Sequence, residues 1–155
     1  MKQIFLDIAF LTTSLPSYAR DVSSSDRQVI LDAARSVAST KAGQPVRLKA
    51  SKLNVDRNWA VLVGYIVPVD GKGLDWDLTY GECNPHLDKM LWVVLNQKHK
   101  RWTVKYIEIC AAEPPYWSME QYGGLVWPCG VYKGLEDGSG ETLDVQCRKQ
   151  INARH

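Results

Sequence analysis

The stretch WAVLVGYIV, residues 59–67, decides the fold predicted for this chain. It is apolar on both faces and rich in β-branched residues, which is typical of a strand buried in the middle of a sheet. Pro68 cannot donate a backbone hydrogen bond and ends the strand, and Asp70-Gly71 predicts a turn after it. We therefore expect a central strand with partner strands on both sides.

The preceding segment supplies one partner. Residues 46–50 alternate between apolar and polar side chains, the pattern of a half-buried strand. The alternation shifts by one position at Leu53 and Val55, which predicts a β-bulge near residues 51–52. A turn is expected at residues 56–58, before the central strand.

Two further strands follow, at residues 90–95 and 102–110, and the polar segment 96–101 is expected to join them. In the last strand the apolar positions alternate and are expected to share one face: Trp102, Val104 and Tyr106.

A helix is predicted over residues 26–41, before the first strand. Ser25 and Gln28 fit a capping box, and Gly43 with Pro45 would end the helix. Its apolar residues recur at helical spacing and form one stripe: Val29, Ile30, Ala33, Ala34, Val37 and Ala38.

A helix followed by four strands indicates the α+β class, with the N-terminal helix packed on a curved antiparallel sheet of about four to five strands. Over about residues 26–110, this order of elements resembles that of cystatin-like and NTF2-like folds. The resemblance is one of element order, so it implies the fold and nothing about activity.

The first 19 residues predict a signal peptide. Lys2 is the positive end, residues 4–11 form an apolar run interrupted by Asp7, and Ser17 and Ala19 are the small residues that a signal peptidase requires. The run is too short to span a bilayer, and no transmembrane segment is expected in the mature chain. We therefore expect a periplasmic or secreted protein, in which residues 20–155 form a single domain.

The four cysteines of an exported chain predict two disulfides. Three pairings are possible. We favour Cys83–Cys110 and Cys129–Cys147, because neighbours in the sequence close the shortest loops.

The region after Cys110 is expected to be irregular and stapled by these disulfides. Residues 113–115 break regular structure, one helical turn is expected at 117–122, and residues 134–141 form a loop. Thr142 to Cys147 is predicted as a final edge strand.

No catalytic or metal-binding motif stands out, and we expect no cofactor. Cys83 and His86 have the spacing of two metal ligands, but a structural zinc site needs four ligands and the cysteines are expected in disulfides. Residues 137–141 place oxygen-bearing side chains at alternate positions, without the full pattern of a calcium loop.

Acidic and aromatic residues in loops are the candidates for contact with a partner protein. The proposed contact residues are Asp75, Trp76, Asp77, Asp88, Tyr116 and Trp117. The same carboxylates are also compatible with a solvated surface or with a pair of glycosidase type. The loop tryptophans Trp76, Trp117 and Trp127 are also expected to seal the edge of the sheet.

Lys98, His99, Lys100 and Arg101 form a compact basic run in the expected hairpin tip. Such a run suits a solvated turn, and it could also contact an anionic lipid, a glycan or an acidic partner. The formal net charge of +2 does not indicate nucleic-acid binding.

Three functions remain open. The leading hypothesis is a periplasmic protein-binding module of the inhibitor or immunity type, which occludes a cell-wall hydrolase or a secreted toxin. The first alternative is a small-ligand carrier with an apolar pocket lined by Trp59, Tyr65 or Trp102. The second is a cell-envelope hydrolase that uses the region of Asp75, Asp77 and His86.

Overall fold

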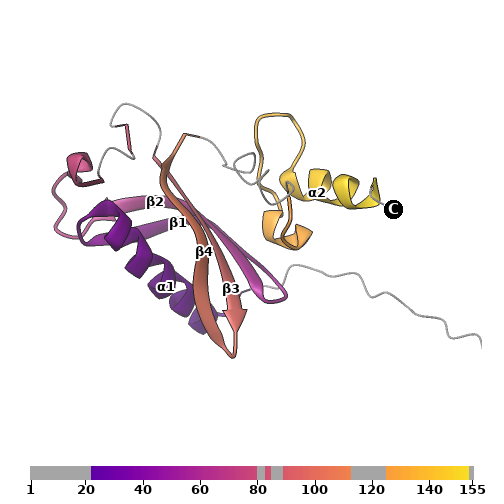
Figure 1. Cartoon of the computed structure of the whole chain (residues 1–155), viewed down its shortest axis with the longest axis horizontal. Coiled ribbons are helices and arrows are strands. Elements are labelled where there is room, and N and C mark those ends of the chain that lie inside the picture. The colour runs from indigo at the N-terminus through magenta and orange to yellow at the C-terminus, as the bar shows by residue number, and fades with distance from the viewer. Residues whose placement is uncertain (1–21, 80–82, 85–88, 113–124, 154–155) are drawn as a thin grey trace, which may run out of the picture.

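The fold was determined from a computed structural model, which describes residues 22–79, 83–84, 89–112 and 125–153. Its elements are, in order, α1 (Ser24–Ala42), β1 (Val46–Asp56), β2 (Trp59–Pro68), the 3₁₀ turn η1 (Trp76–Thr79), β3 (Met90–Lys98), β4 (Arg101–Ala111), the 3₁₀ turn η3 (Cys129–Tyr132) and α2 (Leu143–Asn152) (Figure 1). Neither described α-helix has the length and apolar character needed to cross a membrane.

The four strands form one antiparallel sheet in the order β1-β2-β3-β4. This confirms the α+β class and the central position of β2. The register shifts between Ala50 and Lys52, where the bulge was expected. Gly64 lies opposite this bulge, and a Cβ there would stand 2.1 Å from the carbonyl oxygen of Lys49. Only glycine therefore permits the close approach of β1 and β2 at this point.

A second register shift, between Val94 and Leu95 of β3, makes one prediction wrong. Trp102 and Val104 pack on the α1 side of the sheet, as expected together, but Tyr106 packs on the opposite side. The irregular pairing changes which side chains face each layer, and regular alternation in the sequence could not show it.

Helix α1 begins two residues earlier than predicted, so the capping box at Ser25 and Gln28 was wrong. Ser23 is the N-cap, and its Oγ accepts the backbone N–H of Asp26 at 3.1 Å. Gly43 ends the helix as expected, in the left-handed conformation with φ of 63°.

Two layers cover the two faces of the sheet (Figure 1). Helix α1 covers one face through a helix-side cluster, whose fully buried members include Ile30, Ala34, Leu62, Leu91, Leu95 and Ile109. Residues 125–153, which we call the C-terminal lobe, cover part of the other face through a lobe-side cluster. Its members include Val61, Trp92, Val94, Val131, Tyr132 and Leu143.

The lobe contains a helix where a strand was expected. Residues 142–147 were predicted as an edge strand, but α2 begins at Leu143. Leu143 and Cys147, four residues apart, are both fully buried on one helical face, and Asp144 forms an ion pair with Arg148 at the same spacing. The β-like pairing at this point is a single bridge between Glu136 and Thr142.

Both predicted disulfides are present. Cys83–Cys110 ties the β2–β3 connection to the end of β4, and Cys129–Cys147 ties η3 to α2. The second bond lies in the lobe-side layer and fixes the two helical elements of the lobe to each other.

Candidate functional site

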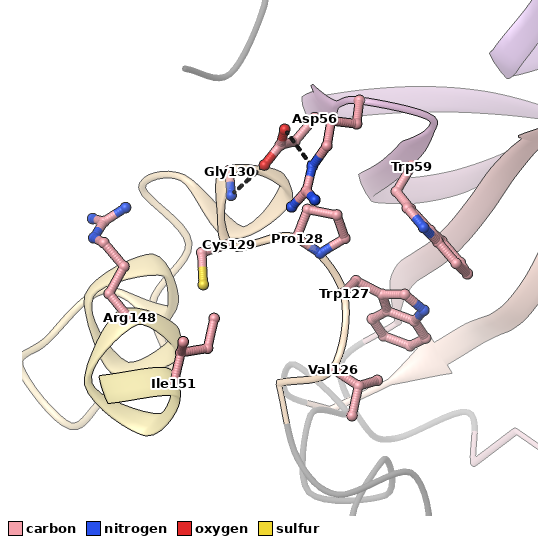
Figure 2. Close-up of a pocket in the computed structure, with 10 residues that line it drawn as sticks. Asp56, Trp59, Val126, Trp127, Pro128, Cys129, Gly130, Arg148 and Ile151 are labelled. Atoms are coloured by element: carbon pink, nitrogen blue, oxygen red, sulfur yellow. Dashed lines mark hydrogen bonds and ion pairs between the residues drawn. The ribbon is translucent and has the colours of Figure 1, made fainter. Parts of the chain in front are cut away.

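A pocket of about 490 Å³ lies where the β1–β2 turn meets the C-terminal lobe (Figure 2). Residues from three separate segments line it: Asp56, Arg57 and Trp59; Val126, Trp127, Pro128, Cys129 and Gly130; and Arg148 and Ile151. The pocket therefore lies at the place where the turn, residues 126–130 and α2 meet.

Two tryptophans form one wall of the pocket. The ring centroids of Trp59 and Trp127 are 5.9 Å apart and the planes are tilted by 43° (Figure 2). The ring centroids of Tyr132 and Trp127 are 6.4 Å apart. Burial raises the pKa of the Tyr132 phenol. This wall is therefore anchored in the lobe-side cluster and is held in a fixed orientation.

Asp56 joins the turn to the lobe. Its carboxylate is 3% exposed, accepts the backbone N–H of Gly130 at 3.1 Å and lies 3.5 Å from Nε of Arg57. A Cβ at position 130 would stand 2.7 Å from Oδ2 of Asp56, so a side chain there would displace the carboxylate. Asp56 is thus a structural anion, and its neighbour Arg57, with a side chain 64% exposed, faces solvent.

Arg148 stands on the α2 side of the pocket and forms an ion pair with Asp144. Burial opposes the ionisation of Asp144, but hydrogen bonds from Thr142, Arg148 and the backbone of Gly134 outweigh it and hold the pKa of this carboxyl below its ordinary value. The Arg148 side chain remains 56% exposed in this pair. Two guanidinium groups, those of Arg57 and Arg148, therefore line the pocket.

Aliphatic side chains complete the rim. Val126 is 40% exposed and Ile151 is 45% exposed, and both line the pocket. An aromatic wall, an aliphatic rim and two cations suit recognition of a ligand that is partly apolar and partly anionic. The ten lining residues include no histidine, serine or lysine that could act as a nucleophile or a general base.

The structure places the acidic loop predicted as a contact surface at the C-terminal end of α1, away from the pocket (Figure 1). The Gln44 side chain donates to the carbonyl of Asp75 at 2.6 Å and accepts its backbone N–H at 3.2 Å. Trp76 is half-buried against the helix-side cluster, with Nζ of Lys89 4.7 Å from its ring centroid. Asp75 and Asp77 are exposed, whereas Asp88, Tyr116 and Trp117 lie outside the described residues.

The three residues expected to line the pocket of a ligand carrier, Trp59, Tyr65 and Trp102, do not lie in one pocket. Trp102 is buried in the helix-side cluster, Tyr65 is 39% exposed with Nζ of Lys49 over its ring, and only Trp59 reaches the pocket. Trp92 and Trp102 are buried in the core.

The other candidate sites are occupied by local contacts or fall outside the described residues. Oδ1 of Asp137 accepts the backbone N–H of Ser139, and Oδ2 accepts the amide of Gln146. Cys83 is in a disulfide, and His86 lies outside the described residues. Within the described part of the chain, no three His, Cys, Asp or Glu side chains gather in a way that could hold a metal ion.

Sequence reasoning missed the pocket, because Arg57, Trp127 and Arg148 come from distant segments. The one signal that could have found part of it was the Cys129–Cys147 pairing, which requires the segment around Trp127 to lie against the helix that carries Arg148.

No protein-family model matches the chain, and no curated protein or solved structure is significantly similar to it. The assignment of a function therefore depends on the geometry of the site.

Proposed function

We propose that residues 20–155 form a periplasmic or secreted protein-binding domain of the inhibitor or immunity type, which occludes a cell-wall hydrolase or a secreted toxin. The pocket beside the β1–β2 turn is the observation that carries this proposal. Its Trp59, Trp127, Arg57 and Arg148 belong to the residue types that dominate binding energy at protein interfaces.

The rigidity of this surface supports the proposal. The tryptophan wall packs on Tyr132, Arg148 is paired with Asp144, and the Cys129–Cys147 bond fixes η3 to α2. A surface that is ordered before binding loses little conformational entropy when the partner arrives, which favours tight occlusion.

Two disulfides support export, because such bonds persist in oxidising compartments and are rare in the cytosol of most organisms. Under this proposal, residues 1–19 are the signal peptide that directs the chain there.

The test is a matched set of charge insertions on exposed aliphatic residues. Ile151→Asp and Val126→Asp change the rim of the pocket, and Val29→Asp changes a residue that is 50% exposed on α1. Each tagged protein is used to capture partners from cell-envelope extracts and from culture medium of competing bacteria. The captured protein is then purified, and its enzymatic or toxic activity is titrated with each variant.

We expect one stoichiometric partner, whose activity falls to zero near a one-to-one ratio with the wild-type protein. The rim variants should bind it about tenfold more weakly, because a carboxylate is placed in an apolar contact, and Val29→Asp should bind normally. The proposal is wrong if no stoichiometric partner is recovered, or if the partner keeps its full activity when bound.

The volume of the pocket favours one alternative, a small-ligand carrier, because ligand sites commonly occupy about 300–1,000 Å³. Native mass spectrometry of protein purified from the envelope separates the two. A retained small molecule that is lost in Ile151→Asp would support the carrier, and an empty protein that binds a macromolecule would support occlusion.

A further inference from the structure

Two hairpin tips lie side by side at one end of the sheet. Asp56 pairs with Trp59 at the β1–β2 tip, and Lys98 pairs with Arg101 at the β3–β4 tip. The carbonyl of Asn58 accepts hydrogen bonds from the backbone of Gln97 at 2.7 Å and from the side chain of Asn96 at 3.0 Å. These bonds hold the two tips together, so they form one continuous surface (Figure 1).

This surface is strongly basic. Arg57 comes from the first tip, and Lys98, Lys100 and Arg101 come from the second, all of them exposed. The one acidic residue in the two tips, Asp56, is buried. Among the described residues, none forms an ion pair with Lys98, Lys100 or Arg101. Together with Arg148 across the pocket, these side chains make a basic strip: Arg57, Lys98, Lys100, Arg101 and Arg148.

Two of the four cations of the tips, Arg57 and Lys100, stand where the backbone disfavours them. In the described part of the chain, the residues other than glycine with positive φ are Arg57 at 55°, His99 at 49° and Lys100 at 62°. A residue with a Cβ atom is disfavoured in this conformation, and Asn-Gly is the preferred pair in a two-residue hairpin turn with positive φ at both positions. A turn that served only to reverse the chain would be more stable with that pair. Strain of this kind is concentrated at functional sites.

We propose that the basic strip binds an extended acidic segment of the partner protein, with an apolar side chain of that segment seated in the adjoining pocket. This inference rests on the proposed function and names the chemistry of the partner. Arg57 belongs to both the strip and the pocket, so a single segment can contact the cations and the Trp59–Trp127 wall. Several exposed cations without paired anions supply the charge complementarity that steers such a segment.

An acidic protein fits this surface better than an anionic membrane does. The turn residues of the two tips, Arg57-Asn58 and His99-Lys100, are all polar and offer no apolar side chain to enter a bilayer. The apolar side chains that share the pocket with Arg57 line a concave surface, which a flat membrane cannot fill.

The test uses the oxidised full-length mature protein and a short fluorescent peptide of alternating glutamate and leucine. The control peptide has glutamine in place of glutamate. The Lys98→Glu/Arg101→Glu variant reverses two charges of the strip. The matched control, Arg47→Glu/Lys72→Glu, reverses one arginine and one lysine at the opposite end of the sheet, where Val46 pairs with Pro68. Fluorescence anisotropy is measured at low and at physiological salt, with vesicles of phosphatidylglycerol as a separate probe.

We expect the glutamate peptide to bind the wild type, to bind the strip variant about tenfold more weakly and to bind the matched control normally. The binding should weaken as salt is added, and the glutamine peptide should not bind. Absence of binding, an equal loss in both variants, or binding to the vesicles alone would each overturn the inference.

The two proposals fail separately. If the captured partner is inhibited and Ile151→Asp releases it, but the strip variant inhibits it normally, the acidic segment is wrong and the occlusion function stands. If no partner is captured, the occlusion function itself is wrong, whatever the peptide does.

Discussion

The two faces of the sheet are covered by structures of different kinds. On one face, α1 applies a regular stripe of small and branched side chains, with Ile30, Ala34, Ala38 and Ala42 fully buried. On the other face, the C-terminal lobe combines a 3₁₀ turn, a short helix and irregular chain, held by the Cys129–Cys147 bond. The pocket beside Trp59 lies on the irregular face, between the β1–β2 turn and the lobe. Close packing favours stability on one side, and the pocket on the other side is the site that we propose binds a partner.

The largest effect is expected where the lobe meets the sheet. Trp92 is fully buried in the lobe-side cluster, so Trp92→Ala should lower the free energy of unfolding by about 3–5 kcal/mol. Leu62→Ala, fully buried on the helix side, should cost about 2–5 kcal/mol and is the matched control. Urea denaturation measures both. A loss below about 1 kcal/mol for Trp92→Ala alone would show that the lobe does not cover this face.

Removal of the lobe disulfide should separate the two layers. Cys129→Ala/Cys147→Ala is expected to cost about 3 kcal/mol, because the cross-link closes a loop within the lobe. Hydrogen exchange should show that the amides of α2 lose protection while those of α1 and β3 keep theirs. Equal loss of protection in α1 and α2 would contradict a lobe that opens independently.

The contact between the β1–β2 turn and the lobe is more localised. Gly130→Ala should cost about 1–3 kcal/mol, because the new methyl group meets the carboxylate of Asp56. Gly73→Ala has open space and is the control, with an expected change within about 0.5 kcal/mol. Thermal unfolding of both variants measures the difference. The same loss in the two variants would mean that the Asp56–Gly130 contact does not anchor the lobe.

Acid should weaken the lobe before the helix side. The pKa of Asp144 is below its ordinary value in the folded protein, so its ionised form stabilises α2 at neutral pH. That contribution is lost as the pH falls below the ordinary pKa of aspartate and through the lower folded pKa. Asp144→Asn should lower stability at neutral pH by about 1 kcal/mol and flatten the acid dependence of α2 exchange. An unchanged acid profile in the variant would exclude this role.

The smallest expected change is an increase in the free energy of unfolding, produced by a change in the β3–β4 turn. His99→Asn/Lys100→Gly places the preferred pair in the β3–β4 turn and should raise the free energy of unfolding by about 0.5–1 kcal/mol. The same variant should bind the glutamate peptide more weakly, because one cation of the basic strip is removed. A variant that gains stability and binds the peptide normally would show that the turn serves the fold alone.

The sequence predicts α1 and the sheet well, because these elements depend on periodic patterns of apolar residues. The apolar stripe of α1, the alternation in β1 and the apolar run of β2 each specify an element and most of the face that it buries. Val29 is the exception, because it was placed in the α1 stripe but is 50% exposed. The lobe is less predictable. Leu143, Val145 and Cys147 alternate as in a strand, yet the buried pair Leu143 and Cys147 follows the four-residue spacing of a helix. The disulfide to Cys129 and the burial of Leu143 and Cys147 in the lobe-side cluster accompany the helical form.

The candidate site is the least predictable part. Asp75, Trp76 and Asp77 are neighbours in the sequence, so a pattern could single them out, and they remain a predicted contact surface. Arg57 and Arg148 lie in the same pocket only because a turn, a 3₁₀ element and a helix meet in space. A local sequence pattern cannot show that these three distant segments come together in the fold.

The most direct test of the account is site-resolved photo-crosslinking in the cell envelope. A photoreactive residue replaces Ile151 at the pocket, Leu78 beside the acidic loop, or Val29 on α1, all of which are exposed. The account predicts a discrete adduct with one protein from position 151 and none from position 29. Adducts from position 78 or 29 without any from position 151 would place the partner on the other layer and contradict it.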